Sequence, residues 1–153
     1  MTKQSNSSAV KASDTGSTNS AAQTTTMANK LVRSHHELDV YRIAFDTAMQ
    51  IFEISRTFPV EERYSLTDQV RRSSRTICAN IAEAWRRRRY EGSFLLRLND
   101  AEAEAAETQT WIEFAVRCGY IETEKGRELF ASYDNILGKL VNLINNPSAW
   151  LLK

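Results

Sequence analysis

Apolar side chains recur every three or four residues through four successive stretches of the chain between residues 37 and 145. In the second stretch, successive residues placed about 100° apart around a helix bring one mostly apolar stripe onto a single side. The stripe consists of Leu66, Val70, Ser73, Ile77, Ile81, Ala84 and Trp85. No stretch alternates apolar and polar residues over the length of a strand, so no sheet is expected. The 153 residues include only 5 glycines and 2 prolines, which favours long helices over frequent turns. The sequence therefore predicts an all-α protein.

The four predicted helices have similar lengths and short connections, and they cover about residues 37–57, 66–90, 94–118 and 124–145. Pro59 ends the first helix, because the residue before a proline is driven out of the α region. Gly92 and Ser93 separate the second helix from the third, and Gly119 is a natural residue to end the third. Helices of matched length with short loops predict an antiparallel up-down-up-down four-helix bundle.

The bundle is predicted to occupy residues 35–146, between an N-terminal tail of residues 1–34 and a C-terminal tail of residues 147–153. The N-terminal tail is rich in Ser, Thr and Ala and cannot bury enough apolar surface to become ordered, so we expect disorder there. Met27 directly precedes the periodic region and is a candidate for the true start of translation. No apolar stretch approaches the roughly 18 residues that span a bilayer, so no membrane association is expected.

The residue patterns of known catalytic sites are missing from the sequence. Its two histidines, His35 and His36, are adjacent at the edge of the predicted bundle, and no Glu-x-x-His motif is present to build a di-iron centre. Cys78 and Cys118 have no CxxC partner and are expected to be reduced, as in a cytoplasm. There is no glycine-rich phosphate loop and no nucleophile elbow. We therefore expect no catalytic residue, no metal, no cofactor and no enzymatic activity.

The net charge of +1 conceals two oppositely charged stretches. Residues 71–89 contain seven arginines and one acid, Glu83, whereas residues 100–113 contain five acids and no lysine or arginine. In one interpretation the arginines contact phosphates, for which guanidinium forks are well suited, with Trp85 and Tyr90 stacking on bases. The arginines in question are Arg71, Arg72, Arg75, Arg86, Arg87 and Arg89.

In the other interpretation, which residue chemistry alone favours slightly, the arginine-rich helix pairs with the acidic helix, either beside it or in a neighbouring subunit. Arginines near the end of a helix would also suit the helix dipole. Arg88 falls in line with the apolar stripe rather than with Arg86 and Arg89, so it is predicted to be structural. Both interpretations remain open at this point.

Trp111 and Phe114 lie to either side of the apolar stripe of the third helix. Burial in the core is the default expectation for aromatic residues in a small bundle. A second apolar face on such a bundle, however, is typical of contact with a partner. We therefore expect Trp111 and Phe114 to belong to a surface through which the chain self-associates, together with the second helix.

The stretches "LTDQVRRSSRTICANIAEAWRRRRYEGSF" and "LNDAEAEAAETQTWIEFAVRCGYI" resemble four-helix-bundle proteins of the 23S rRNA intervening-sequence type. The resemblance covers roughly residues 36–145. It is most specific at Arg71-Arg72, at the Asn80 to Glu83 segment and at Glu107-Thr108-Gln109. It implies a small bacterial cytoplasmic bundle that assembles as a ring-like pentamer and binds RNA or DNA. A reverse transcriptase or another protein is a further partner that it implies.

Many members of that family carry glycines where this chain has Ala84 and Arg86. Their replacement predicts a longer, stiffer second helix that carries the arginines on regular turns. Asn80 and Glu83 are expected to be structural, joined to Thr108 or Gln109 of the third helix.

Together, the residues and the resemblance predict a non-enzymatic, oligomeric four-helix bundle that binds RNA or another nucleic acid through its arginine-rich face. The alternative is a structural or adaptor homo-oligomer whose arginines form ion pairs between subunits.

Overall fold

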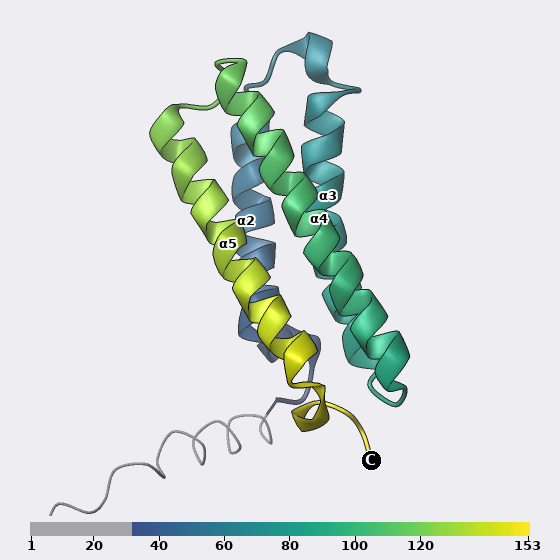
Figure 1. Cartoon of the computed structure of the whole chain (residues 1–153). Helices are drawn as coiled ribbons and strands as arrows, with labels where there is room; N and C mark the ends of the chain where they lie inside the picture. The colour runs from purple at the N-terminus through teal and green to yellow at the C-terminus, as the bar shows by residue number, and fades with distance from the viewer. Residues whose placement is uncertain (1–31) are drawn as a thin grey trace, which may run out of the picture.

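A computed structural model describes residues 32–153, which form four α-helices (Figure 1). The predicted disorder of residues 1–31 and the role of Met27 lie outside the described residues. The helices are α2 (Asp39–Ser55), α3 (Leu66–Arg86), α4 (Glu91–Arg117) and α5 (Thr123–Asn145). Three short 3₁₀ helices accompany them: η1 (His35–Glu37), η2 (Val60–Glu62) and η3 (Pro147–Ala149). No strand occurs between residues 32 and 153, which confirms the predicted all-α class with four helices.

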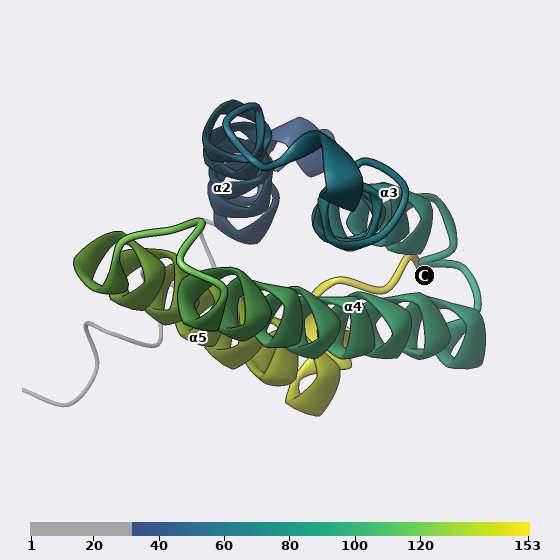
Figure 2. The same ribbon diagram turned by 90° about the horizontal axis from the view of Figure 1, so that it is seen from above.

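Each helix packs mainly against its neighbours in the chain, and α5 also packs against α2. Seen from above, α2 and α3 lie on one side of the bundle, and α4 and α5 lie on the other (Figure 2). The turn between α3 and α4 lies at the same end of the molecule as η3 and the C-terminus (Figure 1). This end therefore carries the arginine run of residues 86–89.

The side chains predicted to form the core are buried where the helices meet. Each helix contributes large apolar residues that are at most 1% exposed, namely Ile51 from α2, Val70, Ile77 and Ile81 from α3, Leu98 and Ile112 from α4, and Leu129, Ile136 and Leu140 from α5. The helical spacing of the sequence thus identifies the inward faces of all four helices. Within residues 32–153, no helix is both long and apolar enough to cross a membrane.

The boundary between α3 and α4 differs from the prediction. Helix α3 ends at Arg86, so Arg87, Arg88 and Arg89 lie in a turn and not on regular helical turns. Helix α4 begins at Glu91, so Gly92 lies inside a helix that it was predicted to precede. The expectation of a longer second helix is therefore wrong.

Packing explains the early end of α3. Trp85 is the last buried residue of α3, and Phe94 is the first of α4, so the chain must reverse between them. The Arg87 N–H still bonds to the carbonyls of Glu83 and Ala84, which closes the last turn of α3. The Arg88 carbonyl instead accepts a bond of 3.0 Å from the N–H of Leu152, near the C-terminus.

Polar contacts between the helices also differ from expectation. The hydroxyls of Thr108 and Ser73 lie 2.8 Å apart in the core between α3 and α4. Gln109 points to α5 instead, where its amide donates to the Phe130 carbonyl and to Asp134. The predicted links from Asn80 and Glu83 to Thr108 or Gln109 are therefore wrong, although Asn80 is buried as a structural residue would be.

Candidate nucleic-acid interface

The structure separates the six predicted phosphate-binding arginines into three places. Arg71 and Arg75 project from α3 toward α2, where their guanidinium carbons lie 5.0 and 5.8 Å from the centroid of the Phe52 ring. Arg72 lies on the other side of α3 and pairs with Asp68 at 3.6 Å. Arg86, Arg87 and Arg89 lie at the end of α3 and in the turn that follows.

Phe52 brings a further arginine into the first of these places. Arg56, at the end of α2, lies 5.9 Å from the centroid of the same ring. Sequence reasoning missed both Phe52 and Arg56. A signal for them exists, since residues four positions apart share one side of a helix.

The arginines at the end of α3 are exposed to solvent. Arg87 lies 3.7 Å from Glu83 and 3.3 Å from the Ser93 hydroxyl. Arg86 and Arg89 form no hydrogen bond or ion pair through their side chains with any residue from 32 to 153. Their positive charges therefore remain available to an external anion.

Arg88 lies in the turn after α3 and is turned back onto the bundle, which agrees with its predicted structural role. Its guanidinium lies 3.4 Å from the centroid of the Trp85 ring and donates to the carbonyls of Trp85 and Trp150 at 2.8 and 3.3 Å. Burial lowers the pKa of Arg88, and repulsion from Arg86 lowers it further. These contacts make Arg88 part of the fold.

The same contacts correct one prediction about base stacking. Trp85 is only 6% exposed and is covered by Arg88 and by Trp150, whose ring centroid lies 6.2 Å away. It therefore has no free face for a nucleic-acid base. Tyr90 is 72% exposed and remains accessible in the turn.

Within residues 32–153, the acids of α4 form no ion pair with the arginines of α3. Among the described residues, the ion pair that joins α3 to α4 runs in the opposite sense, from Arg97 of α4 to Glu83 of α3 at 3.1 Å. Burial raises the pKa of Glu104, as do repulsion from Glu107, a hydrogen bond with Glu107 and repulsion from Asp100, whereas the nearby Arg72 of α3 lowers it in part. Within residues 32–153, ion pairs with the acids of α4 therefore do not account for the arginines of α3, whereas pairing between subunits stays a prediction.

Trp111 and Phe114 form a partly exposed aromatic pair on α4. Their ring centroids lie 5.9 Å apart, and the Trp111 indole N–H donates to Glu107 at 3.2 Å. Phe114 is 54% exposed and Trp111 is half-buried, so neither is a fully buried core residue. This pair is the apolar part of the surface predicted for self-association.

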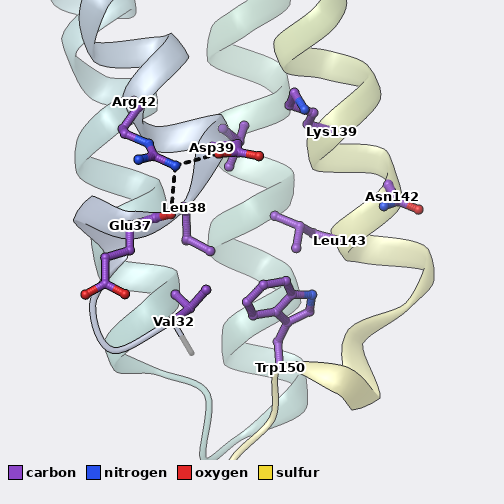
Figure 3. A pocket seen from close by; sticks show the side chains of 10 residues that line it. Val32, Glu37, Leu38, Asp39, Arg42, Lys139, Asn142, Leu143 and Trp150 are labelled. Atoms are coloured by element: carbon purple, nitrogen blue, oxygen red, sulfur yellow. Dashed lines mark hydrogen bonds and ion pairs between the residues drawn. The ribbon is translucent and has the colours of Figure 1, made fainter. Parts of the chain in front are cut away.

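A pocket of about 360 Å³ lies between η1, the start of α2 and the end of α5 (Figure 3). Val32 and Trp150 form part of its apolar wall. Arg42 donates to the Asp39 carboxylate at 2.6 Å and to the Glu37 carbonyl at 3.3 Å. Arg42 and Asp39 are thus paired with each other, and we make no catalytic assignment at this pocket. Between residues 32 and 153 there is also no group of three or more His, Cys, Asp or Glu residues placed to hold a metal ion.

Comparison with known proteins gives one family and a solved structure. Residues 36–142 match the 23S rRNA-intervening sequence protein family. The chain is also similar to the crystal structure of a protein of unknown function from the S23 ribosomal protein family of Bacteroides thetaiotaomicron. The two share 28% sequence identity with a TM-score of 0.63, over 69% of this chain and 95% of that chain. A comparison with curated proteins gives no significant match.

Proposed function

The chain belongs to the 23S rRNA-intervening sequence protein family, and from this premise we propose that it is a non-enzymatic, oligomeric protein that binds RNA or another nucleic acid. The binding surface is formed by the arginines that α3 turns toward α2 and by those in the turn after α3. The proposal takes the helices in the antiparallel up-down-up-down order predicted from the loop lengths. It places the protein in a bacterial cytoplasm, where a reverse transcriptase or another protein is a possible further partner.

One observation carries the proposal: the arginines of this surface have almost no internal counter-charge. Arg71, Arg75, Arg86 and Arg89 form no ion pair within residues 32–153, and Arg87 lies at the long distance of 3.7 Å from Glu83. Guanidinium groups bind phosphate oxygens through paired, charge-assisted hydrogen bonds. The family takes its name from sequences that interrupt 23S rRNA, which makes RNA the first ligand to test.

Self-association is the second part of the proposal, and the exposed Trp111–Phe114 pair supports it. A ring of subunits, a pentamer as the family resemblance implies, would repeat the arginine surface around its axis. A protomer with a net charge of only +1 would then still present a strongly basic face. The competing function is an adaptor oligomer in which the arginines of one subunit pair with the acids of α4 in the next.

The test is RNA binding against salt concentration with the triple variant Arg86→Ala/Arg87→Ala/Arg89→Ala, which leaves the structural Arg88 in place. A fragment of 23S rRNA serves as the ligand, and fluorescence anisotropy gives the affinity. For single-stranded RNA, each lost phosphate contact reduces the salt dependence of log K by about 0.7. Three lost contacts should therefore reduce this slope by about 2 and weaken binding strongly at low salt.

The matched control is Arg127→Ala, because Arg127 is an exposed arginine of α5 that pairs with Glu124 at 3.0 Å, away from α3. It should bind RNA as the parent protein does. The mass of the particle, measured by light scattering after gel filtration, should stay the same in both variants. If the triple variant instead breaks the oligomer apart and the parent protein does not bind RNA, the adaptor function is correct.

A further inference from the structure

Three arginines from two helices surround one aromatic ring at the border between α2 and α3. The guanidinium carbons of Arg71, Arg75 and Arg56 lie 5.0, 5.8 and 5.9 Å from the centroid of the Phe52 ring. An aromatic face attracts a cation electrostatically, which offsets part of the repulsion among the three charges. Phe52 thus gathers three cations into one small area of the surface.

Arg71, the most buried of the three arginines, is held in a defined orientation. The Ser55 hydroxyl, on a residue that is 2% exposed, donates to the Phe52 carbonyl at 3.0 Å and accepts a bond of 2.8 Å from the Nε–H of Arg71. An arginine has five N–H donors. Ser55 engages one of them, and Arg71 forms no other side-chain hydrogen bond with residues 32–153. Its two terminal amino groups therefore remain to bind an external acceptor.

The nearby acids leave this cluster strongly positive. Glu53 reaches Arg56 at the long distance of 3.4 Å, and both side chains are 62% exposed. Asp68 on α3 pairs with Arg72 and not with the cluster. An arrangement of like charges that is fixed by a buried hydroxyl and an aromatic ring is suited to a ligand with several negatively charged oxygens.

We propose that Arg56, Arg71 and Arg75, held against Phe52, form a binding site for a phosphate group. The inference rests on the proposed function, because it takes the phosphate to belong to the backbone of the bound nucleic acid. A free phosphate ion offers the same chemistry from another source. The site lies about 20 Å along α3 from the arginines of the following turn, at 1.5 Å per residue, so one extended strand can reach both.

The test separates this organised site from a merely positive surface by using two variants that conserve charge and one that removes a charge. Phe52→Leu keeps all three arginines but removes the ring that gathers them. Arg71→Lys keeps the charge but loses the planar fork and the bond from Nε to Ser55. Each should weaken binding of a 23S rRNA fragment by about threefold to tenfold. Arg56→Gln, at an exposed position, should do the same without affecting the fold.

Arg42→Gln is the matched control, because Arg42 is an exposed arginine of α2 that pairs with Asp39 outside the cluster. It should leave RNA affinity unchanged. Circular dichroism and gel filtration check that every variant is folded and assembled as the parent protein is. In a second experiment, inorganic phosphate is titrated into the full chain, and the NMR signal of the Arg71 Nε–H reports binding at the cluster.

The outcomes separate this inference from the proposed function. Unchanged RNA affinity in Phe52→Leu and Arg56→Gln, together with a loss in the triple variant of the turn, overturns the phosphate site and leaves the proposed function in place. If neither the variants of the Phe52 cluster nor the triple variant of the turn changes RNA affinity, the phosphate site and the proposed function are both overturned. A shift of the Arg71 signal with phosphate, without any RNA binding, supports the site but with free phosphate as its ligand. Loss of the oligomer in Arg56→Gln overturns the inference, because the cluster then holds carboxylates of a neighbouring copy.

Discussion

Replacing Arg88 by alanine should destabilise the bundle, whereas replacing Arg87 or Arg89 should leave the free energy of unfolding almost unchanged. Arg88 lies over the Trp85 ring at 3.4 Å and donates to two carbonyls, one of them 62 residues away at Trp150. It therefore attaches the C-terminal segment to the end of α3. The neighbouring Arg87 and Arg89 are exposed and make no comparable contact with the bundle.

The loss in the free energy of unfolding can be worked out from these contacts. A cation over an aromatic ring contributes about 0.5–2 kcal/mol, depending on how far it is removed from water. Each hydrogen bond from the charged group adds about 1 kcal/mol at this half-buried position, which is below the range for fully buried charged groups. Their sum is about 3 kcal/mol. At about 4 °C per kcal/mol for a domain of this size, the midpoint of thermal unfolding should fall by about 10 °C.

Urea and thermal unfolding followed by circular dichroism measure the effect. Arg87→Ala and Arg89→Ala are the matched controls and should change the free energy of unfolding by no more than about 0.5 kcal/mol. Arg88→Lys should fall between, because lysine keeps a cation near the ring but lacks the planar fork that reaches both carbonyls. A change below 0.5 kcal/mol for Arg88→Ala, or an equal loss for Arg89→Ala, would refute the structural role.

Three further predictions concern the core and the cysteines. Gly126→Ala should destabilise the protein by about 1–3 kcal/mol, because a Cβ at this position would overlap the Val116 side chain. Gly138→Ala, on the same helix, has open space around the new Cβ and should stabilise the protein by up to about 1 kcal/mol. Equal effects of the two variants on urea unfolding would contradict this reasoning. Tyr133→Phe should raise stability by up to about 1 kcal/mol in the same assay, since the buried hydroxyl has no hydrogen-bond partner among residues 32–153, and a loss of stability would mean that the hydroxyl is bonded. A maleimide reagent at pH 8 should label the exposed Cys118 but not Cys78 in the native protein, because burial raises the pKa of Cys78 to about 11. Mass spectrometry measures the labelling of each cysteine. Equal labelling rates would contradict this prediction and show that the core opens readily.

The class of the fold could be predicted because apolar residues recur at helical spacing through all four helices. The end of α3 could not, because local preference and tertiary packing disagree there. Arginine is a good helix former, and neither glycine nor proline interrupts residues 86–90, so local preference continues the helix. In a continued helix, the Arg88 carbonyl would accept from the N–H of Gly92. The fold gives that carbonyl to Leu152 instead, and no pattern within α3 reveals this contact.

The candidate site was predictable in part for a related reason. Helical spacing groups Arg71 with Arg75, and it also predicts the structural role of Arg88, although Arg88 lies in the turn after α3 and not on the helix. It does not reveal which side of another helix these residues meet, so Phe52 and Arg56 were missed. For the same reason, Gln109 of α4 was expected to bond to Asn80 or Glu83 of α3, although it bonds to α5. Sequence spacing orders the residues of one helix, whereas contacts between helices depend on how the bundle closes.

The low net charge of the chain is therefore a poor guide to its binding surface, because α3 separates the charges in space. Its side toward α2 carries Arg71 and Arg75 on the Phe52 ring, and its side toward α4 faces Glu104 and its acidic neighbours. Either a nucleic-acid phosphate or a carboxylate of another copy can neutralise the arginines, but both cannot occupy the Phe52 cluster at once. Arg86 and Arg89 lie at the far end of α3, so they can contact a ligand even where a neighbouring copy covers that cluster. RNA binding that survives changes at Phe52 but not at the turn, together with loss of the oligomer in Arg56→Gln, would place the subunit contact on the α2 side of α3.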